Sequence, residues 1–402
     1  MTSALVASLF LGSLALGLPT TPAFSSPLLE HQQRQACSPA TDIPAASTSM
    51  LPDPFVFADG TRVTTADQWS CRQEEILNAL EQYELGELPA PPSSLSATMS
   101  GGSLSITVGV GSNTATFSAS ISGGSTSSPA PAFIAIGGAS IPIPAGVATI
   151  NFGNDAFAAQ NGGGSRGSGI FYDLHGSDHS AGALAAWAWG VSRVVDALEE
   201  LGPSVTGIDP ERLGVTGCSR NGKGAFVVGA LEPRIALTVP QESGAGGAAC
   251  WRVSDAEKAQ GKNIQTAEQI VGENVWFSPR FNTWTTQTSA LPYDHHMLAG
   301  LVAPRGLYVP ENDIDWLGPV STTACMRAGR MIYEALGSKN SMGISVATNH
   351  GHCQFPAGQN AELTQFIDYF LLGGGSAPDD LDKSAVSADV GSYIDWEAPT
   401  LS

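Results

Sequence analysis

The sequence predicts an α/β fold in which helices cover both faces of a mostly parallel sheet. Two observations carry this prediction. Short, almost continuously apolar strands alternate with helical patterns from about residue 132 onward, and a glycine-flanked turn joins one such strand to a helix. Apolar strands of this kind are typical of parallel sheets, because helices bury both of their faces. We therefore expect one large domain built around this sheet.

The individual elements follow from periodicity. Residues 70–83 have the apolar spacing of a helix, and the alternating residues 95–122 predict a β-hairpin around a Gly-Ser-Asn-Thr turn. Further strands are expected at 132–136, 147–152, 213–216, 235–240, 306–309 and 344–347. Further helices are expected at 181–201, 222–231, 322–336 and 361–372.

The N-terminal region predicts secretion. Residues 1–23 have the apolar run and following small residues of a signal peptide, and the run is too short for a transmembrane helix. Residues 24–50 are rich in Pro, Ser, Thr and Gln and predict an extended arm. We expect residues 51–402 to form a single domain without an appended carbohydrate-binding module. We expect a secreted, extracellular protein that does not associate with a membrane.

Composition and cysteine usage narrow the class of protein. With 18 Lys and Arg against 37 Asp and Glu, the formal net charge is −19, which excludes a nucleic-acid binder held by phosphate contacts. Six cysteines in an oxidising compartment predict three disulfides. Their spacing does not match a zinc site. We expect no metal and no cofactor, and a monomer.

The segment RLGVTGCSRNGKGAFVV, residues 212–228, carries the candidate nucleophile. A short apolar strand, a tight turn at Ser219 and a helix of small residues are the features of a nucleophile elbow. The second glycine of the usual G-x-S-x-G pattern is replaced by Asn221, and we expect Asn to fit because it tolerates left-handed backbone. The segment does not match the phosphate-binding pattern G-x-x-x-x-G-K-[S/T], because Gly224 follows Lys223 where that pattern needs Ser or Thr.

A serine nucleophile needs a histidine base and an acid that orients it. His350 and His352 follow the last apolar strand, where the base is expected. For the acid, the pattern leaves two places open: Glu242 follows the strand at 235–240, whereas Asp313 and Asp315 follow the strand at 306–309.

Several motifs together resemble the fungal glucuronoyl esterases, carbohydrate esterase family 15. They are Gly217-Cys-Ser-Arg-Asn-Gly-Lys223, VPQESG at 239–244, DHH at 294–296, ENDIDWLG at 311–318, HCQFP at 352–356 and LPDPFVFADGTRVTTADQWSCR at 51–72. The resemblance covers essentially the whole mature chain. It implies an α/β-hydrolase fold, a three-layer αβα sandwich. It also implies cleavage of the ester between 4-O-methyl-glucuronic acid of glucuronoxylan and lignin alcohols.

The resemblance also implies roles for individual residues. Ser219 would be the nucleophile, Glu242 the acid and His352 the base, with Arg220 at the oxyanion. Sugar contacts would come from Lys223, Gln265, Glu273 and Trp316. The implied disulfides are Cys37–Cys71, Cys218–Cys353 and Cys250–Cys325. Asp313 and Asp315 lie near an acid position that some relatives use.

Two other hypotheses about the function remain beside that of a glucuronoyl esterase. One is another secreted serine esterase, such as an acetyl xylan esterase, a cutinase or a lipase; Arg220 and Lys223 beside the nucleophile favour a polar substrate over a lipid. The other is a non-catalytic carbohydrate-binding domain that keeps the fold. The presence of Ser219, Glu242 and His352 argues against it.

Overall fold

The computed structural model describes residues 37–402, which belong to one compact unit. The expected signal peptide and residues 24–36 of the expected arm lie outside the described residues. Residues 37–50 of the arm contain neither helix nor strand. Within the described part of the chain, no helix is long and apolar enough to cross a membrane.

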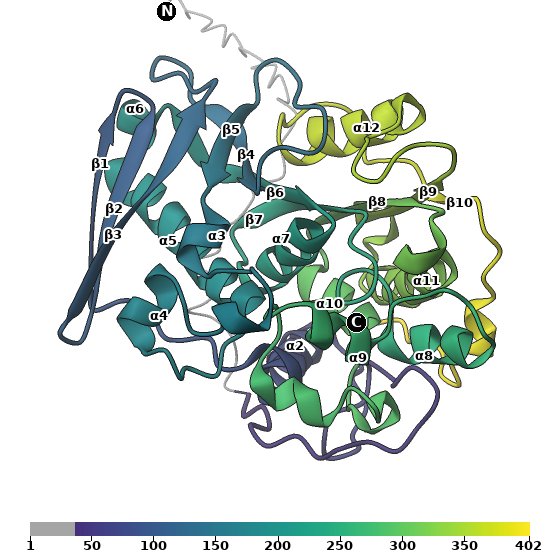
Figure 1. The fold of residues 1–402 in the computed structure, drawn as a ribbon. Coiled ribbons are helices and arrows are strands. Elements are labelled where there is room, and N and C mark those ends of the chain that lie inside the picture. Colours follow the sequence, from purple (N-terminus) through teal and green to yellow (C-terminus); the bar gives the residue numbers. More distant parts are fainter. Residues whose placement is uncertain (1–36) are drawn as a thin grey trace, which may run out of the picture. The chain divides into compact units, whose positions relative to one another are not determined.

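Ten strands of residues 37–402 form one sheet in the order β1-β2-β3-β5-β4-β6-β7-β8-β9-β10 (Figure 1). All pairs from β5 to β10 are parallel, and the pairs from β1 to β5 through β2 and β3 are antiparallel. This confirms the mostly parallel sheet. The strands are β1 (Ser94–Ser100), β2 (Ser103–Val110), β3 (Asn113–Ser122), β4 (Ala130–Ile136), β5 (Ala148–Phe152), β6 (Ile208–Cys218), β7 (Ile235–Gln241), β8 (Gly306–Asn312), β9 (Met342–Ala347) and β10 (Asp382–Ser384).

The single hairpin predicted over residues 95–122 is wrong in one respect, because this segment forms three antiparallel strands. The additional strand, β1, alternates polar residues with Leu95, Ala97 and Met99, which pack against the core but are only half-buried. Gly101 and Gly102 join β1 to β2, and both have positive φ. Two-residue hairpin turns favour glycine for this reason.

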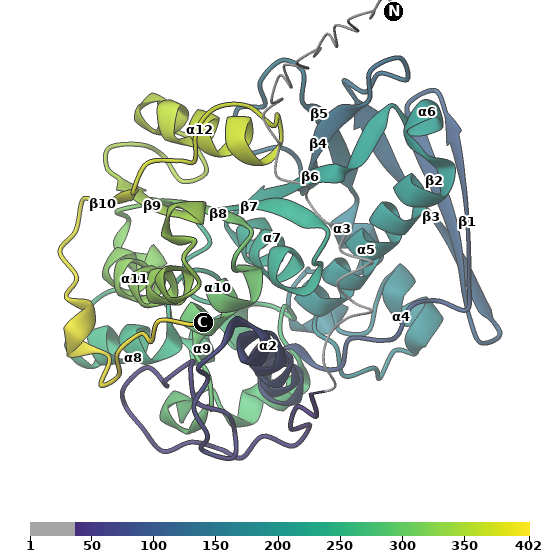
Figure 2. The same cartoon turned by 180° about the vertical axis from the view of Figure 1, so that it is seen from behind.

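Helices cover both faces of the sheet (Figures 1 and 2). On one face lie α5 (Ala183–Leu201), α7 (Arg220–Leu231), α10 (His295–Val302) and α11 (Pro319–Ala335), and on the other lies α12 (Asn360–Phe370). The alternation along β8 shows the two faces: Leu307 and Val309 belong to the larger core, whereas Tyr308 stacks on Phe366 of α12. The αβα sandwich and the predicted long helices are therefore confirmed.

Shorter helices complete the described unit. The helix predicted at 70–83 corresponds to α2 (Ala66–Leu80), which continues as a π-helical turn to Leu85. Five others are short, and their periodicity was too brief to predict them from the sequence. They are α3 (Asn154–Phe157), α4 (Ile170–His175), α6 (Pro203–Thr206), α8 (Trp251–Ala259) and α9 (Ala267–Glu273).

Close packing between α5 and α7 fixes the helix that begins after Ser219. Trp187 of α5 is fully buried, and its indole donates a hydrogen bond to the Ala158 carbonyl at 2.9 Å. A Cβ on Gly224 of α7 would lie 2.7 Å from the Trp187 ring. The two helices can approach this closely because residue 224 has no side chain.

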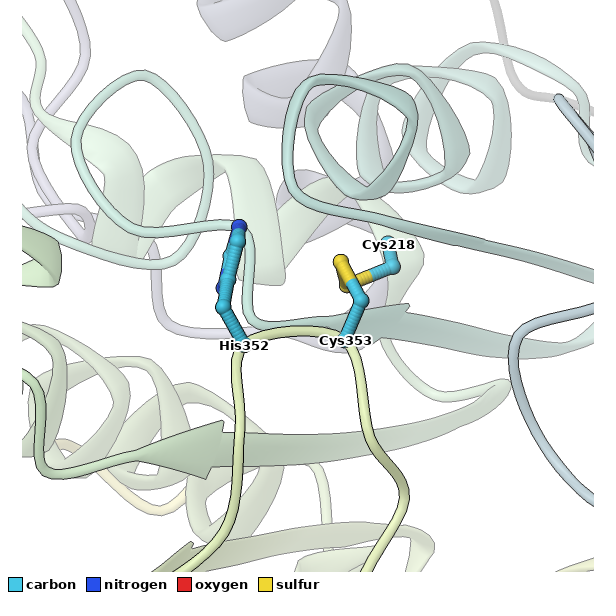
Figure 3. A group of neighbouring side chains, drawn as sticks. All are labelled: Cys218, His352 and Cys353. Atoms are coloured by element: carbon cyan, nitrogen blue, oxygen red, sulfur yellow. A yellow bond between two sulfur atoms is a disulfide. The ribbon is translucent and has the colours of Figure 1, made fainter.

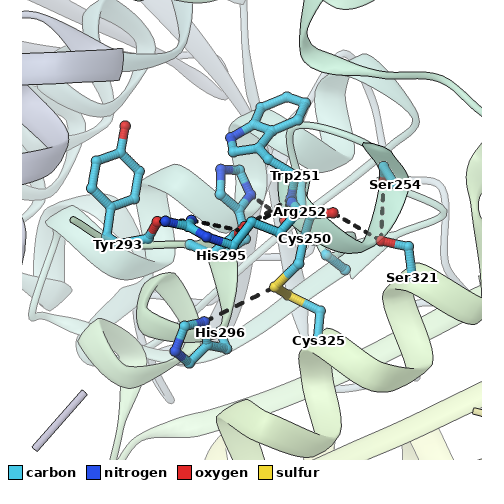
Figure 4. Close-up of a disulfide and its surroundings, with 12 residues drawn as sticks. Cys250, Trp251, Arg252, Ser254, Tyr293, His295, His296, Ser321 and Cys325 are labelled. Atoms are coloured by element: carbon cyan, nitrogen blue, oxygen red, sulfur yellow. Dashed lines mark hydrogen bonds and ion pairs between the residues drawn. A yellow bond between two sulfur atoms is a disulfide. The ribbon is translucent and has the colours of Figure 1, made fainter. Parts of the chain in front are cut away.

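Three disulfides form, and the pairs are those that the resemblance implies: Cys37–Cys71, Cys218–Cys353 and Cys250–Cys325. The first ties residue 37 of the arm to α2. The third joins the start of α8 to α11 (Figure 4). All six cysteines are paired, so none of them offers a free thiol.

A buried polar cluster near Cys250 anchors the chain that follows β7 (Figure 4). Asp294, which is fully buried, accepts hydrogen bonds from the backbone amides of Trp251 and Arg252 at 2.8 and 3.1 Å and so caps α8. The Arg252 guanidinium contacts the same carboxylate at 3.3 Å. The capping bonds and the paired charge together fix the start of α8.

His295 contacts the middle of the loop that joins β7 to α8. Its Nδ1 lies 2.6 Å from the Gly247 carbonyl oxygen and its Nε2 lies 2.9 Å from Glu84 Oε1. Burial lowers the pKa of His295, but the Glu84 carboxylate outweighs burial and leaves the pKa raised. With an acceptor at each ring nitrogen, a protonated imidazole satisfies both contacts. The loop between Glu242 and α8 is thereby attached to the body of the protein.

Candidate active site

Ser219 occupies a strained turn between β6 and α7. Its backbone has φ 59° and ψ −125°, and it is the N-cap residue of α7. The Ser219 amide donates a hydrogen bond to the Gln241 carbonyl at the end of β7, at 3.0 Å. A half-exposed serine on a strained strand-to-helix turn has the geometry that is expected of a nucleophile elbow.

Two glycines permit this turn. A Cβ on Gly217 would lie 2.5 Å from the Asn221 carbonyl oxygen, and one on Gly222 would lie 2.4 Å from the Gln241 carbonyl oxygen. Both distances are shorter than any side chain can tolerate. The first turn of α7 therefore contacts the ends of β6 and β7 directly through backbone.

The physical reason given for Asn221 is wrong, although the turn forms. Asn221 is the second residue of α7 and is not among the residues with positive φ; Ser219 is the left-handed residue. The Asn221 side chain has a different use. Its Oδ1 accepts hydrogen bonds from Asn154 Nδ2 at 3.1 Å and from Gln160 Nε2 at 3.2 Å. Asn221 thus ties the elbow to the chain after β5.

Glu242 and His352 form a short hydrogen-bonded pair. Glu242 follows β7, is 1% exposed and has φ 46°. Its Oε2 lies 2.7 Å from His352 Nδ1 and accepts a hydrogen bond from the Cys353 amide at 2.9 Å. The other imidazole nitrogen is therefore free to face the cavity. Trp316 packs edge-on against the imidazole, with ring centroids 4.9 Å apart.

The other predicted candidates lie differently. His350 Nδ1 is 3.6 Å from Glu242 Oε1 and 3.2 Å from Asn312 Nδ2, and the His350 side chain is 6% exposed. Among residues 37–402, neither Asp313 nor Asp315 forms a side-chain hydrogen bond to a histidine, and Asp315 is exposed. The geometry brings Glu242 to His352 and leaves both aspartates outside this contact.

The Cys218–Cys353 disulfide lies directly beside His352 (Figure 3). A ring nitrogen of His352 and the two sulfur atoms all lie within 4.8 Å of one another. This cluster does not offer thiolate ligands for a metal, because both sulfurs are bonded to each other. The bridge instead connects the residue before Ser219 with the residue after His352.

A cavity of about 340 Å³ opens over Ser219 and His352. Seven of the residues implied by the resemblance line this one cavity, together with one tryptophan that sequence reasoning missed. The lining residues are Ser219, Arg220, Lys223, Gln265, Glu273, Trp276, Trp316 and His352. Gln265 and Glu273 come from the segment around α9 and contact each other at 3.3 Å.

Trp276 is the missed residue, and it forms a wall beside the two cations. The Arg220 guanidinium carbon lies 5.8 Å and the Lys223 Nζ lies 5.6 Å from the centre of its ring. Its indole nitrogen donates to Gln160 Oε1 at 2.7 Å, which links the wall to the residue that contacts Asn221. A tryptophan is more often a core residue than a binding residue. The only signal in the sequence for a place in the cavity was therefore that Trp276 lies three residues after Glu273.

Two buried ionisable groups lie close together here: Lys223, which lines the cavity, and Glu311, which is not part of its lining. Lys223 is 4% exposed, and burial lowers its pKa to about 8, although Glu311 and Glu273 act in the opposite direction. Glu311 is 1% exposed, and burial raises its pKa to about 8; the Gly244 amide and Lys223 oppose this shift, and Glu242 adds to it. Burial thus favours the neutral form of both groups, and each partly opposes the pKa shift of the other.

Most of the chain is similar in sequence to known glucuronoyl esterases. Residues 106–337 match a family model described as "Glucuronyl esterase, fungi". A Neurospora crassa 4-O-methyl-glucuronoyl methylesterase is 58% identical over 381 residues, which are 94% of this chain and 96% of that protein. The Hypocrea jecorina protein of the same name is 54% identical and covers 89% of this chain and 77% of its own.

Solved structures agree with the sequence relatives. A crystal structure of the Sporotrichum thermophile glucuronoyl esterase superposes with a TM-score of 0.90 at 58% identity, covering 91% of this chain and all of that one. A mutant of that esterase, in complex with methyl 4-O-methyl-β-D-glucopyranuronate, also gives 0.90 at 58% identity, covering 92% of this chain and 100% of that one. The catalytic domain from Hypocrea jecorina gives 0.87 at 53% identity, covering 90% and 99%.

The contact between α7 and β7 leads to a prediction. Gly222→Ala should lower the free energy of unfolding by about 1–3 kcal/mol, because the new Cβ would collide with the Gln241 carbonyl. Thermal unfolding measures the effect. The control is Gly272→Ala in α9, where a Cβ meets nothing within 4 Å and the protein should be as stable as the wild type or slightly more so. Equal melting temperatures for Gly222→Ala and the wild type would contradict the packing described for the elbow.

Proposed function

The chain belongs to the fungal glucuronyl esterases, and we propose that it hydrolyses the ester between 4-O-methyl-D-glucuronic acid of glucuronoxylan and lignin alcohols. The observation that carries this proposal is the composition of one cavity. It combines a strained serine, a histidine paired with a buried carboxylate at 2.7 Å, two cations and polar groups suited to a sugar. A lipase pocket would need an apolar lining in place of Arg220 and Lys223.

The proposed reaction is two-step acyl transfer. His352 takes the proton of the Ser219 hydroxyl as the oxygen attacks the uronate carbonyl carbon, and then gives this proton to the leaving alcohol. Water repeats the two steps on the acyl-enzyme and releases the uronic acid and free Ser219. Glu242 accepts the Nδ1 hydrogen bond of His352, which fixes the tautomer and steadies the imidazolium charge.

The oxyanion has two sources of positive charge in this proposal. The backbone amide of Arg220 is the first of α7, a 12-residue helix, so the helix N-terminus points at the developing charge. The Arg220 guanidinium is exposed to the cavity and cannot lose its proton. It therefore offers a fixed positive charge at the place where negative charge develops.

The remaining cavity residues supply contacts for the sugar. Lys223, Gln265 and Glu273 can form directed hydrogen bonds with ring hydroxyls or the methoxy oxygen. Trp316 and Trp276 offer apolar faces to a pyranose ring. The cavity volume of about 340 Å³ suits one uronate residue with its ester group, and leaves the polysaccharide and the bulk of the alcohol outside.

The expected secretion and domain organisation are part of the same proposal. A signal peptide over residues 1–23, secretion, an arm to residue 50 and a single catalytic domain over 51–402 fit an enzyme that meets its polymer outside the cell. The paired cysteines fit an oxidising compartment. The proposed substrate is glucuronoxylan esterified with lignin, acted on by a monomer without metal or cofactor.

The substrate proposal is tested by comparing esters. Purified protein should hydrolyse benzyl glucuronate with a higher kcat/KM than p-nitrophenyl acetate or a triglyceride, because the cavity offers polar groups to the sugar. A Ser219→Ala variant serves as the blank and should show no turnover above background. A preference for the acetate would instead support an acetyl esterase, and a preference for the triglyceride would support a lipase.

The identity of the acid gives a second test. Glu242→Gln should lower kcat by about 10³-fold or more, because the imidazolium loses its carboxylate partner. Asp315→Asn, in the turn that follows the next strand, is the matched control and should stay within about threefold of the wild type. The reverse ranking would place the acid after β8.

A further inference from the structure

Glu311 is a buried carboxyl group that the proposed mechanism does not use. It lies near the end of β8 and is 1% exposed. Its Oε1 accepts hydrogen bonds from the Ser243 hydroxyl at 3.3 Å and from the Gly244 amide at 3.1 Å. Its Oε2 is buried and has no hydrogen-bond partner within residues 37–402. A buried carboxyl group with only one oxygen satisfied is costly, so the contacts that it does form call for an explanation.

The two contacts of Glu311 fall on the residues that follow Glu242. Glu242 has φ 46°, a conformation that costs a non-glycine residue of the order of 1–3 kcal/mol. Its own amide donates to the Pro310 carbonyl of β8 at 2.9 Å. Glutamate at this backbone conformation persists only where the neighbouring residues are held, and Ser243 and Gly244 are the next two residues.

Ser243 is held from three directions. Its carbonyl oxygen accepts a hydrogen bond from Lys223 Nζ at 2.6 Å, and its hydroxyl oxygen accepts one from the Ala248 amide at 3.0 Å. The hydroxyl proton is therefore donated to Glu311, which is the contact that fixes its rotation. Lys223 also lines the substrate cavity, so the turn after Glu242 is attached to the substrate site on one side and to β8 on the other.

We propose that Glu311 is a positioning residue that holds the turn at residues 242–244 and thereby aims the Glu242 carboxylate at His352. This inference rests on the proposed esterase function. Glu311 acts through the Ser243 hydroxyl and the Gly244 amide, and its role is separate from that of the carboxylate that contacts the imidazole. Mispositioning of a catalytic group by about 1 Å costs about 10²-fold in rate, which sets the size of the expected effect.

The charge state of Glu311 agrees with this role. Burial raises its pKa to about 8, which favours the neutral acid, and the Oε1 of a neutral acid can still accept two hydrogen bonds as a carbonyl oxygen. A neutral group here also avoids a second buried negative charge beside Glu242. Glutamine has the same shape and keeps this acceptor, which makes Glu311→Gln a conservative replacement.

The test is a double-mutant cycle between Glu311→Leu and Glu242→Gln. Glu311→Leu should lower kcat on benzyl glucuronate by about 10²-fold with little change in KM. In the Glu242→Gln background, the same substitution should cost less than about threefold, because the carboxylate that Glu311 positions is already gone. Equal costs in both backgrounds would overturn the proposal, since a residue that only stabilises the fold acts independently of Glu242.

A pH profile gives a readout that general destabilisation does not change. In Glu311→Leu the acid limb of kcat/KM should move to lower pH, because the imidazolium loses part of the carboxylate contact that stabilises its charge. The titratable and charged groups around this pair in the wild type are His350, Lys223, Arg220, Glu273 and Glu311 itself. An acid limb identical to that of the wild type would count against the proposal.

Two further variants keep the test decisive if Glu311→Leu folds poorly. Glu311→Gln should retain kcat within about threefold at pH 7, because its side-chain carbonyl still accepts from Ser243 and Gly244. A loss as large as that of Glu311→Leu would show that the acid itself is required and would overturn the positioning role. The matched control is Glu362→Leu, which removes a buried carboxylate bonded to Tyr308 of the same strand. It should lower the melting temperature and leave the acid limb unchanged.

Failure of the proposed function is distinguishable from failure of this inference. A wild-type enzyme that does not hydrolyse benzyl glucuronate would refute the proposed substrate. The cycle can then be measured with p-nitrophenyl acetate, because Glu311 is proposed to act on the triad and not on the sugar. Non-additive losses on either ester support the positioning role, and additive losses on the ester that is turned over contradict it.

Discussion

The candidate active site depends on backbone conformations that residues other than glycine rarely adopt. Within residues 37–402, positive φ outside glycine occurs at Ser219, Glu242, Asn349 and Cys353, and all four belong to the three segments that carry the proposed triad. Each such conformation costs of the order of 1–3 kcal/mol and persists only where the surroundings hold it. The sheet, the flanking glycines and the buried polar groups supply that support.

The three segments are also tied directly to one another. The Ser219 amide bonds to the end of β7, the residue next to Glu242. Glu242 accepts hydrogen bonds from the His352 ring and the Cys353 amide, and Cys353 is joined by its disulfide to Cys218, the neighbour of Ser219. These contacts close a ring through the proposed nucleophile, acid and base. Each of the three segments is thus attached to the other two, which holds their backbone in place before a substrate arrives.

The sequence predicted those parts of the structure that produce a pattern among neighbouring residues. Apolar strands, long amphipathic helices and the elbow at Ser219 all have local signals, and the family motifs pointed to the residues that line the cavity. The choice between Glu242 and Asp315 had no local signal, because both follow a strand and the pairing with His352 depends on tertiary structure. The same holds for Trp276 and Glu311, which look like ordinary core positions along the chain. The strand β1 was not predicted as a separate strand. Its Leu95, Ala97 and Met99 alternate with polar residues as in β2 and β3, so only the turn at Gly101 and Gly102 separates it from β2.

The central claim is that the closed ring, and not overall stability alone, sets the reactivity of Ser219. The most direct measurement is kcat on benzyl glucuronate for the double variant Cys218→Ala/Cys353→Ala, made at a temperature where the variant is folded. The account predicts a loss of about tenfold or more with KM nearly unchanged, because Ser219 and His352 lose their shared tether. A kcat equal to that of the wild type, with only a lower melting temperature, would show that the disulfide stabilises the fold without aligning the site.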